Sequence, residues 1–164
     1  MEIEQLYGDI KALDKGVQTS LKRSLGLKFS SAHIPMKTRF FVFSHAPSNA
    51  DRDCLQAIFF CCCVMANGNE KNLIKMQDYL RKLYNTPNSE SEKTRIERLL
   101  EEKAVENGSF YPTLARFIEQ AINQNLSING ISLLNDLLYW NDGSKAIQIK
   151  WAKAISYTEN KEDN

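Results

Sequence analysis

The sequence ISLLNDLLYWNDGSKAIQIKWAKAISY, residues 131–157, has the pattern of two amphipathic helices joined by a tight Asn-Asp-Gly-Ser turn. Leucine and isoleucine recur at helical spacing in the first half, and an apolar stripe that includes Trp151 continues in the second. The chain has two tryptophans, and Trp140 and Trp151 each fall in one half of this stretch. We therefore predict a packed helical hairpin with the two tryptophans as core anchors rather than base-stacking platforms.

The second half of this stretch is also basic. It contains Lys145, Lys150 and Lys153, and no acidic residue lies between Gly143 and Thr158. A helix with an aromatic core face and a basic outer face is suited to an anionic partner. Of the three lysines, Lys150 is the strongest candidate for a phosphate contact because it directly precedes Trp151.

The rest of the chain also shows helical periodicity, and we expect an all-α fold. The segment NTPNSES, residues 85–91, is rich in polar and turn-forming residues and is the best linker candidate. It divides the chain into an N-terminal helical subdomain, residues 1–88, and a C-terminal antiparallel four-helix bundle, residues 89–158. The acidic end, residues 159–164, is expected to be a disordered tail. No strand-like alternation of any length is present.

Two segments of the first half call for separate predictions. Asp51 is a good N-cap for an apolar segment, residues 55–66, which should be the central buried helix. Residues 27–50 are less regular, and the run TRFFVFSHA within them fits a strand or a short helix, with the helix favoured by its surroundings. The phenylalanines of this run could stack on bases, but a core position is the favoured interpretation.

Acidic and basic residues are segregated along the chain although its net charge is +1. Residues 15–50 contain six basic residues and no acid, whereas six glutamates lie within residues 90–106. Lysines often lie along helices without function, so either basic segment alone carries little weight. Two such segments in one small protein favour an anionic partner, most commonly nucleic acid bound through its phosphates.

Several classes of function find no support in the sequence. No apolar run has the length of a membrane span, and the acidic N-terminus resembles no targeting segment. Three of the four cysteines are contiguous, Cys61 to Cys63, which is neither a disulfide framework nor a metal motif, and we expect a reducing cytoplasm. His33 and His45 have no partner at catalytic or ligand spacing. We predict no enzyme, no metal and no cofactor.

Several short motifs follow one another in a recognisable order along the chain. The clearest is a Leu-Leu-x-Asp-Leu-Leu-x-Trp helix followed by a basic-Trp-Ala-basic helix, here residues 133–140 and 150–153. Looser motifs are Lys22-Arg23-Ser24-Leu25, Ile34-Pro35 with Arg39, Arg95 in RIERLLE and Arg116 in RFIEQAI. In their order and spacing these motifs resemble a known family, the small subunit (CasB) of the type I-E CRISPR surveillance complex Cascade. The resemblance covers roughly residues 5–157. The cysteine triplet and the acidic cluster have no counterpart that we can place in the family.

The resemblance implies a non-enzymatic all-α subunit that holds the target and displaced DNA strands of an R-loop. Its partners would be the guide RNA and target DNA, the guide-carrying backbone subunits and a second copy of itself. The nucleic-acid-binding residues carried over are Lys22, Arg23, Arg39, Arg95, Arg116, Lys145, Lys150 and Lys153. The alternative is a helical protein–protein adaptor whose basic face docks an acidic partner, with no role in nucleic-acid binding.

Overall fold

The computed structural model of the chain describes residues 2–157. The predicted acidic tail, residues 159–164, and Thr158 lie outside the described residues. The elements are η1 (Ile3–Gln5), α1 (Leu6–Lys11), α2 (Lys15–Arg23), α3 (Met36–His45), α4 (Arg52–Ala66), β1 (Leu73–Ile74), α5 (Met76–Tyr84), α6 (Glu90–Glu101), α7 (Phe110–Asn123), β2 (Ser127–Ile128), α8 (Gly130–Leu137) and α9 (Ala146–Ser156). The prediction of a mostly helical protein is confirmed.

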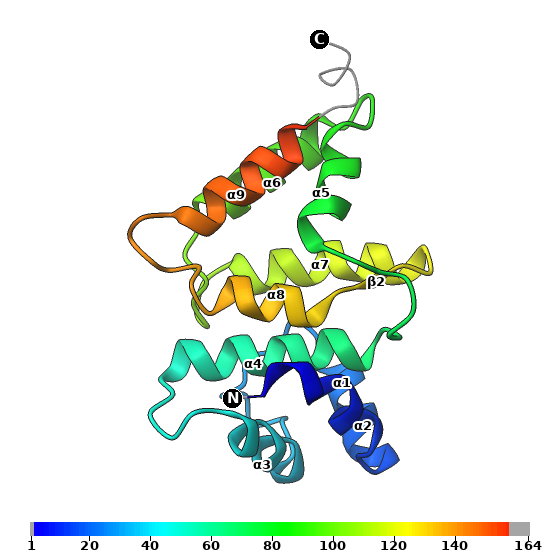
Figure 1. Cartoon of the computed structure of the whole chain (residues 1–164), viewed down its shortest axis with the longest axis vertical. Helices are drawn as coiled ribbons and strands as arrows, with labels where there is room; N and C mark the ends of the chain where they lie inside the picture. Colours follow the sequence, from blue (N-terminus) through cyan, green and yellow to red (C-terminus); the bar gives the residue numbers. More distant parts are fainter. Residues whose placement is uncertain (1, 158–164) are drawn as a thin grey trace.

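The helices lie in layers along the long axis of the molecule (Figure 1). Helices α1, α2 and α3 form one end and pack on α4, whose other side contacts α8. Helix α7 lies beside α8 in the view, and α5, α6 and α9 form the opposite end. One continuous hydrophobic core runs through these layers.

Helix α4 is the centre of the first half, as predicted. The Asp51 side chain accepts a hydrogen bond from the backbone N–H of Cys54 at 2.8 Å, which caps the helix N-terminus. Every residue from Gln56 to Ala66 is buried. A helix that is apolar on all sides requires cover on all sides, and the flanking layers of helices supply it.

The run TRFFVFSHA lies largely in α3, so the helical interpretation of this segment is confirmed. Its Phe41 is buried, as predicted for a core position, but Phe40 and Phe43 are exposed. The core prediction for these two rings is therefore wrong. Helix α3 can bury only one side, and its Thr38, Phe41 and Val42 occupy that side.

A short parallel sheet corrects the expectation that the chain has no strands. Residues Leu73 and Ile74 of β1 pair with Ser127 and Ile128 of β2. Asn129 extends the pairing by donating its backbone N–H to the carbonyl of Ile74 at 2.7 Å. Two residues are too few to show an alternating pattern, so periodicity could not reveal them.

Helix α9 packs against α5 and α6, while α8 packs against α4. These contacts do not confirm an antiparallel bundle formed by the last four helices. They also cross the predicted boundary at residue 88, because α5 precedes it and α9 follows it. The division into two subdomains stays a prediction.

A few side-chain contacts join α8 and the turn that follows it to α9. Trp140 and Trp151 are fully buried, with ring centroids 4.9 Å apart in an edge-on contact. The Asp136 carboxylate accepts hydrogen bonds from Trp151 Nε1 at 2.8 Å and from Lys150 Nζ at 2.6 Å. The prediction that both tryptophans belong to the core agrees with these contacts.

Candidate nucleic-acid interface

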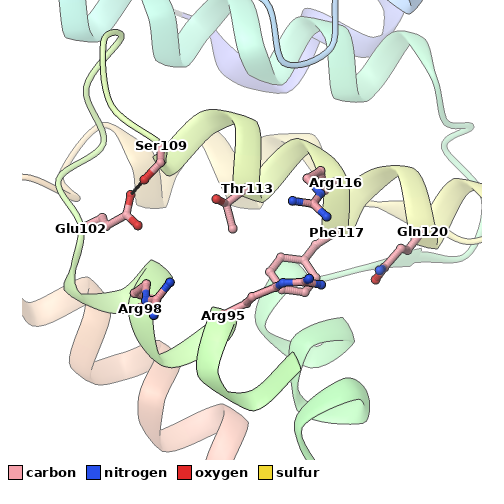
Figure 2. Close-up of a pocket in the computed structure, with 8 residues that line it drawn as sticks. All are labelled: Arg95, Arg98, Glu102, Ser109, Thr113, Arg116, Phe117 and Gln120. Atoms are coloured by element: carbon pink, nitrogen blue, oxygen red, sulfur yellow. Dashed lines mark hydrogen bonds between the residues drawn. The ribbon is translucent and has the colours of Figure 1, made fainter. Parts of the chain in front are cut away.

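A pocket between α6 and α7 brings three arginines together (Figure 2). Arg95 and Arg98 project from α6, and Arg116 projects from α7. The cavity has a volume of about 210 Å³. Its other lining residues are Glu102, Ser109, Thr113, Phe117 and Gln120.

The positive charge of this pocket is only partly neutralised. Arg95 lies 3.5 Å from Glu92 of the preceding helical turn, a distance that gives a weak surface pair. Within residues 2–157, no carboxylate forms an ion pair with Arg98 or Arg116, and both side chains are exposed. The one acid in the lining, Glu102, accepts a hydrogen bond from Ser109 Oγ at 2.6 Å. The pocket is therefore a cationic site open to an anion.

The polar lining adds hydrogen-bonding groups beside the guanidinium groups. The side-chain carbonyl oxygen of Gln120 is buried and has no hydrogen-bond partner in the described chain. Thr113 lies on the same helix, one turn before Arg116 and Phe117. Arginine is well suited to such a site, because its planar guanidinium can bind two phosphate oxygens at once.

Two of the predicted residues, Arg95 and Arg116, thus share one site, and the prediction missed a third, Arg98. A signal for Arg98 was present in the sequence, because Arg95 and Arg98 stand three positions apart in RIERLLE and therefore share a helix face. The sequence could not reveal that this face is directed toward α7. That proximity depends on tertiary packing.

The predicted pair Lys22 and Arg23 lies at the C-terminal end of α2, and both side chains are exposed. The chain then turns at Gly26, which has φ of +89°. A Cβ atom placed on Gly26 would lie 3.2 Å from Cβ of Ala115, the residue before Arg116. This close approach brings the turn after the basic pair against the helix that carries Arg116.

Arg39 has a structural role in the described chain. Its guanidinium donates hydrogen bonds to the backbone carbonyls of Phe29 at 2.6 Å and Ile34 at 3.2 Å, and also to that of Ser31. It lies 5.5 Å from the centre of the Phe29 ring. Because these contacts hold the loop before α3, they occupy most of the donors that a phosphate would need.

Two of the three lysines predicted in the C-terminal stretch also have internal partners. Lys150 pairs with the buried Asp136, and Lys145 lies 3.7 Å from Glu101 of α6. Lys153 is exposed on α9 and forms no ion pair within residues 2–157. Asp136 and Glu101 therefore neutralise part of the positive charge predicted for this stretch.

The cysteine triplet is buried among apolar side chains, as predicted. Burial raises the pKa of the Cys62 thiol from 9.0 to about 12 and raises the pKa of Cys61 and Cys63 well above their ordinary value. Such thiols are poor nucleophiles at neutral pH. No cluster of three potential metal ligands occurs among residues 2–157.

His45 has a partner that its sequence neighbours did not predict. Its Nε2 lies 2.8 Å from Asp9 of α1, and its Nδ1 lies 2.9 Å from the carbonyl oxygen of Phe41. The contact with Asp9 joins the end of α3 to α1.

None of the helices in residues 2–157 has the length and apolar character needed to span a membrane.

Comparison with known structures finds the same fold in CRISPR-associated proteins. The chain is similar to M. ruber CasB with a TM-score of 0.75 and 20% identity, covering 99% of this chain and 97% of that protein. It is also similar to two structures from Thermus thermophilus, a Cse2-family protein (TM-score 0.69, 18% identity) and CasB (TM-score 0.70, 16% identity). Each of these two matches covers 94% of this chain and 97% of the other. Among curated protein sequences, none matches this chain.

The family itself is identified by sequence. The family model for the CRISPR-associated protein Cse2 matches residues 17–154, which extend from within α2 to within α9 and include all eight predicted binding residues. This match confirms the resemblance that the order of the short motifs indicated. The chain belongs to the Cse2 (CasB) family of CRISPR-associated proteins, the small subunits of type I-E Cascade complexes.

Proposed function

We propose that this protein is the non-catalytic small subunit of a CRISPR RNA-guided surveillance complex and stabilises the R-loop by binding the phosphates of the target and displaced DNA strands. The observation that carries the proposal is the pocket of Arg95, Arg98 and Arg116, in which two guanidinium groups have no carboxylate partner within the described chain. The guide-carrying subunits and a second copy of this chain are its expected partners in the complex.

Phosphate binding without base recognition is what such a role requires. In an RNA-guided complex, base pairing with the guide reads the target sequence, so an accessory subunit needs only contacts to the DNA backbone. During R-loop formation, part of the DNA duplex is replaced by an RNA–DNA duplex of similar stability. A few charge-assisted contacts to the strands are therefore enough to shift the balance toward the open state.

We propose that the eight predicted residues contribute unequally to binding. Arg95 and Arg116, with the added Arg98, form the primary site, and Lys22 and Arg23 extend it because the turn after them packs against α7. Lys153 is a peripheral candidate. The remaining three, Arg39, Lys145 and Lys150, are bound to groups of the protein itself and are expected to contribute less to binding.

The test is a titration of labelled single-stranded and duplex DNA of random sequence with the purified protein over a series of salt concentrations. The Arg98→Gln/Arg116→Gln variant removes two charges from the pocket. The matched control, Lys71→Gln/Lys75→Gln, removes two exposed lysine charges beside β1. For single strands, the slope of log K against log salt should fall by about 0.7 per lost contact, hence about 1.4 in all.

Binding by the control should match that of the wild type, and all three proteins should show the same thermal unfolding. Equal affinities and equal salt slopes for the pocket variant and the wild type would refute the assignment of this site. Absence of binding by the wild type at the lowest salt would refute an intrinsic nucleic-acid site in the isolated subunit.

A further inference from the structure

Helix α3 presents a second surface that has no role in the proposed nucleic-acid site. Three of its apolar side chains are directed to solvent, with exposed fractions of 66% for Met36, 67% for Phe40 and 50% for Phe43. Their spacing of four and then three residues places them on one face of the helix. We call these three side chains the α3 stripe.

The opposite side of α3 is already packed. Thr38, Phe41 and Val42 are buried, and the helix contacts α2 and α4. A helix that is apolar on both sides is normally covered on both sides, and clustered exposed apolar side chains mark an interaction surface. The stripe holds three of the six large apolar side chains exposed in residues 2–157, which sets it apart from scattered exposure.

The stripe is held in a fixed position. The Phe43 ring lies 5.4 Å from the Phe29 ring in an edge-on contact, and Arg39 binds the carbonyls of the loop that carries Phe29. A partner would therefore meet a preformed surface and lose little conformational entropy in ordering it.

The charges around the stripe indicate which kind of partner it fits. Helix α3 carries Lys37 and Arg39 and no acid, and the loop before it carries Lys28 and no acid. Lys37, within the first turn of α3, forms a single weak ion pair within residues 2–157, 3.8 Å from Asp14, and both side chains are exposed. A complementary surface would be apolar at its centre and carry Asp or Glu at its border.

Two other occupants fit these observations less well. A nucleic-acid strand stacked on Phe40 would find one weakly paired cation on this helix, Lys37, because the adjacent Arg39 donates its hydrogen bonds to backbone carbonyls. A symmetric dimer through this face would place Lys37 and its basic neighbours against the same residues of the second copy.

We infer that the α3 stripe docks an unlike protein subunit, one that presents an apolar patch bordered by carboxylates. The inference that this partner is another subunit of the same complex rests on the function proposed above. The stripe is the anchor to the assembly, whereas the arginine pocket contacts DNA, so the two surfaces can be disabled separately.

The experiment uses the complex assembled from guide RNA and all other subunits, to which purified small subunit is added and its incorporation measured. The Met36→Ser/Phe40→Ser variant removes the two most exposed side chains of the stripe and spares Phe43, which contacts Phe29. The control, Tyr139→Ser/Ile149→Ser, removes two similarly exposed apolar side chains near α8 and in α9. A few central apolar side chains commonly supply most of the binding free energy of an interface. The stripe variant should therefore bind the complex at least about tenfold more weakly.

The control should incorporate like the wild type, and both variants should unfold at the wild-type temperature and keep wild-type affinity for free DNA. A photoreactive benzoylphenylalanine in place of Phe40 should cross-link to another protein subunit. Equal incorporation of the stripe variant and the control would overturn the inference, as would cross-links confined to a second copy of this chain or to nucleic acid. Loss of DNA binding by the arginine variant is a separate readout and tests only the proposed function.

Discussion

The pairing of Lys150 with Asp136 predicts that substitution of this lysine alters stability more than DNA binding. The Asp136 side chain is 7% exposed and the Lys150 side chain is 51% exposed, with 2.6 Å between the paired atoms. Replacing Lys150 with methionine keeps the apolar stem but leaves the buried carboxylate with Trp151 Nε1 as its remaining side-chain donor. A hydrogen bond to a charged group contributes about 1.5–3 kcal/mol, and the exposure of Lys150 favours the lower end of this range.

The expected effect of Lys150→Met is therefore a loss of about 1.5–2 kcal/mol, which corresponds to a fall in Tm of roughly 3–8 °C for a chain of this size. Thermal and urea unfolding followed by tryptophan fluorescence would measure it, because both tryptophans lie beside this pair and are fully buried. Adding Asp136→Asn to Lys150→Met removes the stranded charge and should recover part of the loss.

The control for this experiment is Arg116→Gln, which should leave Tm unchanged and weaken DNA binding. If Lys150→Met unfolds like the wild type and weakens DNA binding as much as Arg116→Gln does, the structural interpretation of Lys150 is refuted. The residue would then act as the phosphate contact that the sequence alone indicated.

Three further predictions follow from other contacts. Arg39→Met should cost about 1.5–3 kcal/mol in urea unfolding, and Arg39→Lys should restore little of it, because one ammonium cannot reproduce the fork of donors that holds three loop carbonyls. Gly130→Ala should cost about 1–3 kcal/mol by the same measurement, since its Cβ would lie 2.5 Å from Cγ of Met65; an unchanged midpoint would contradict this packing. A thiol reagent should modify Cys54 in the folded protein and the cysteine triplet only on unfolding.

Ionisation of the triplet also predicts how stability depends on pH. Burial raises the pKa of Cys62 from 9.0 to about 12, so the folded state retains a proton that the unfolded state loses between these values. Stability is therefore fully present below about pH 9 and falls as pH rises toward 12, by about 1.4 kcal/mol per pH unit for each such thiol. Urea midpoints of the wild type and of Cys62→Ala, measured from about pH 8 to 11, would test this, and parallel curves for the two proteins would contradict it.

Local patterns in the sequence predicted the elements that depend on local chemistry. Asp51 as a cap, the apolar α4 and the helical α3 follow from residue types within a few positions of one another. The same reasoning could not place α9, because its apolar face fits α5 and α6 as well as α8. Periodicity shows that a face is buried but does not identify the element that buries it.

For the candidate site, the sequence identified charged residues but not their internal partners. Lys150 and Arg39 were predicted on the same grounds as Arg116, yet Asp136 and a set of loop carbonyls engage the first two. These partners are separated in sequence or belong to the backbone, and composition does not reveal them. Conversely, Arg98 becomes a candidate only because α7 lies beside α6 and places Arg116 in the same pocket.

The position of α4 between two groups of helices has a consequence for biosynthesis. Helices α1 to α3 are synthesised with it, but α8, which contacts its other side, begins only at Gly130. While the ribosome makes the intervening residues, the side of α4 that packs against α8 lacks its cover. We expect chaperones that hold exposed apolar segments to bind the nascent chain at this stage, and their release to coincide with the emergence of α8 from the exit tunnel.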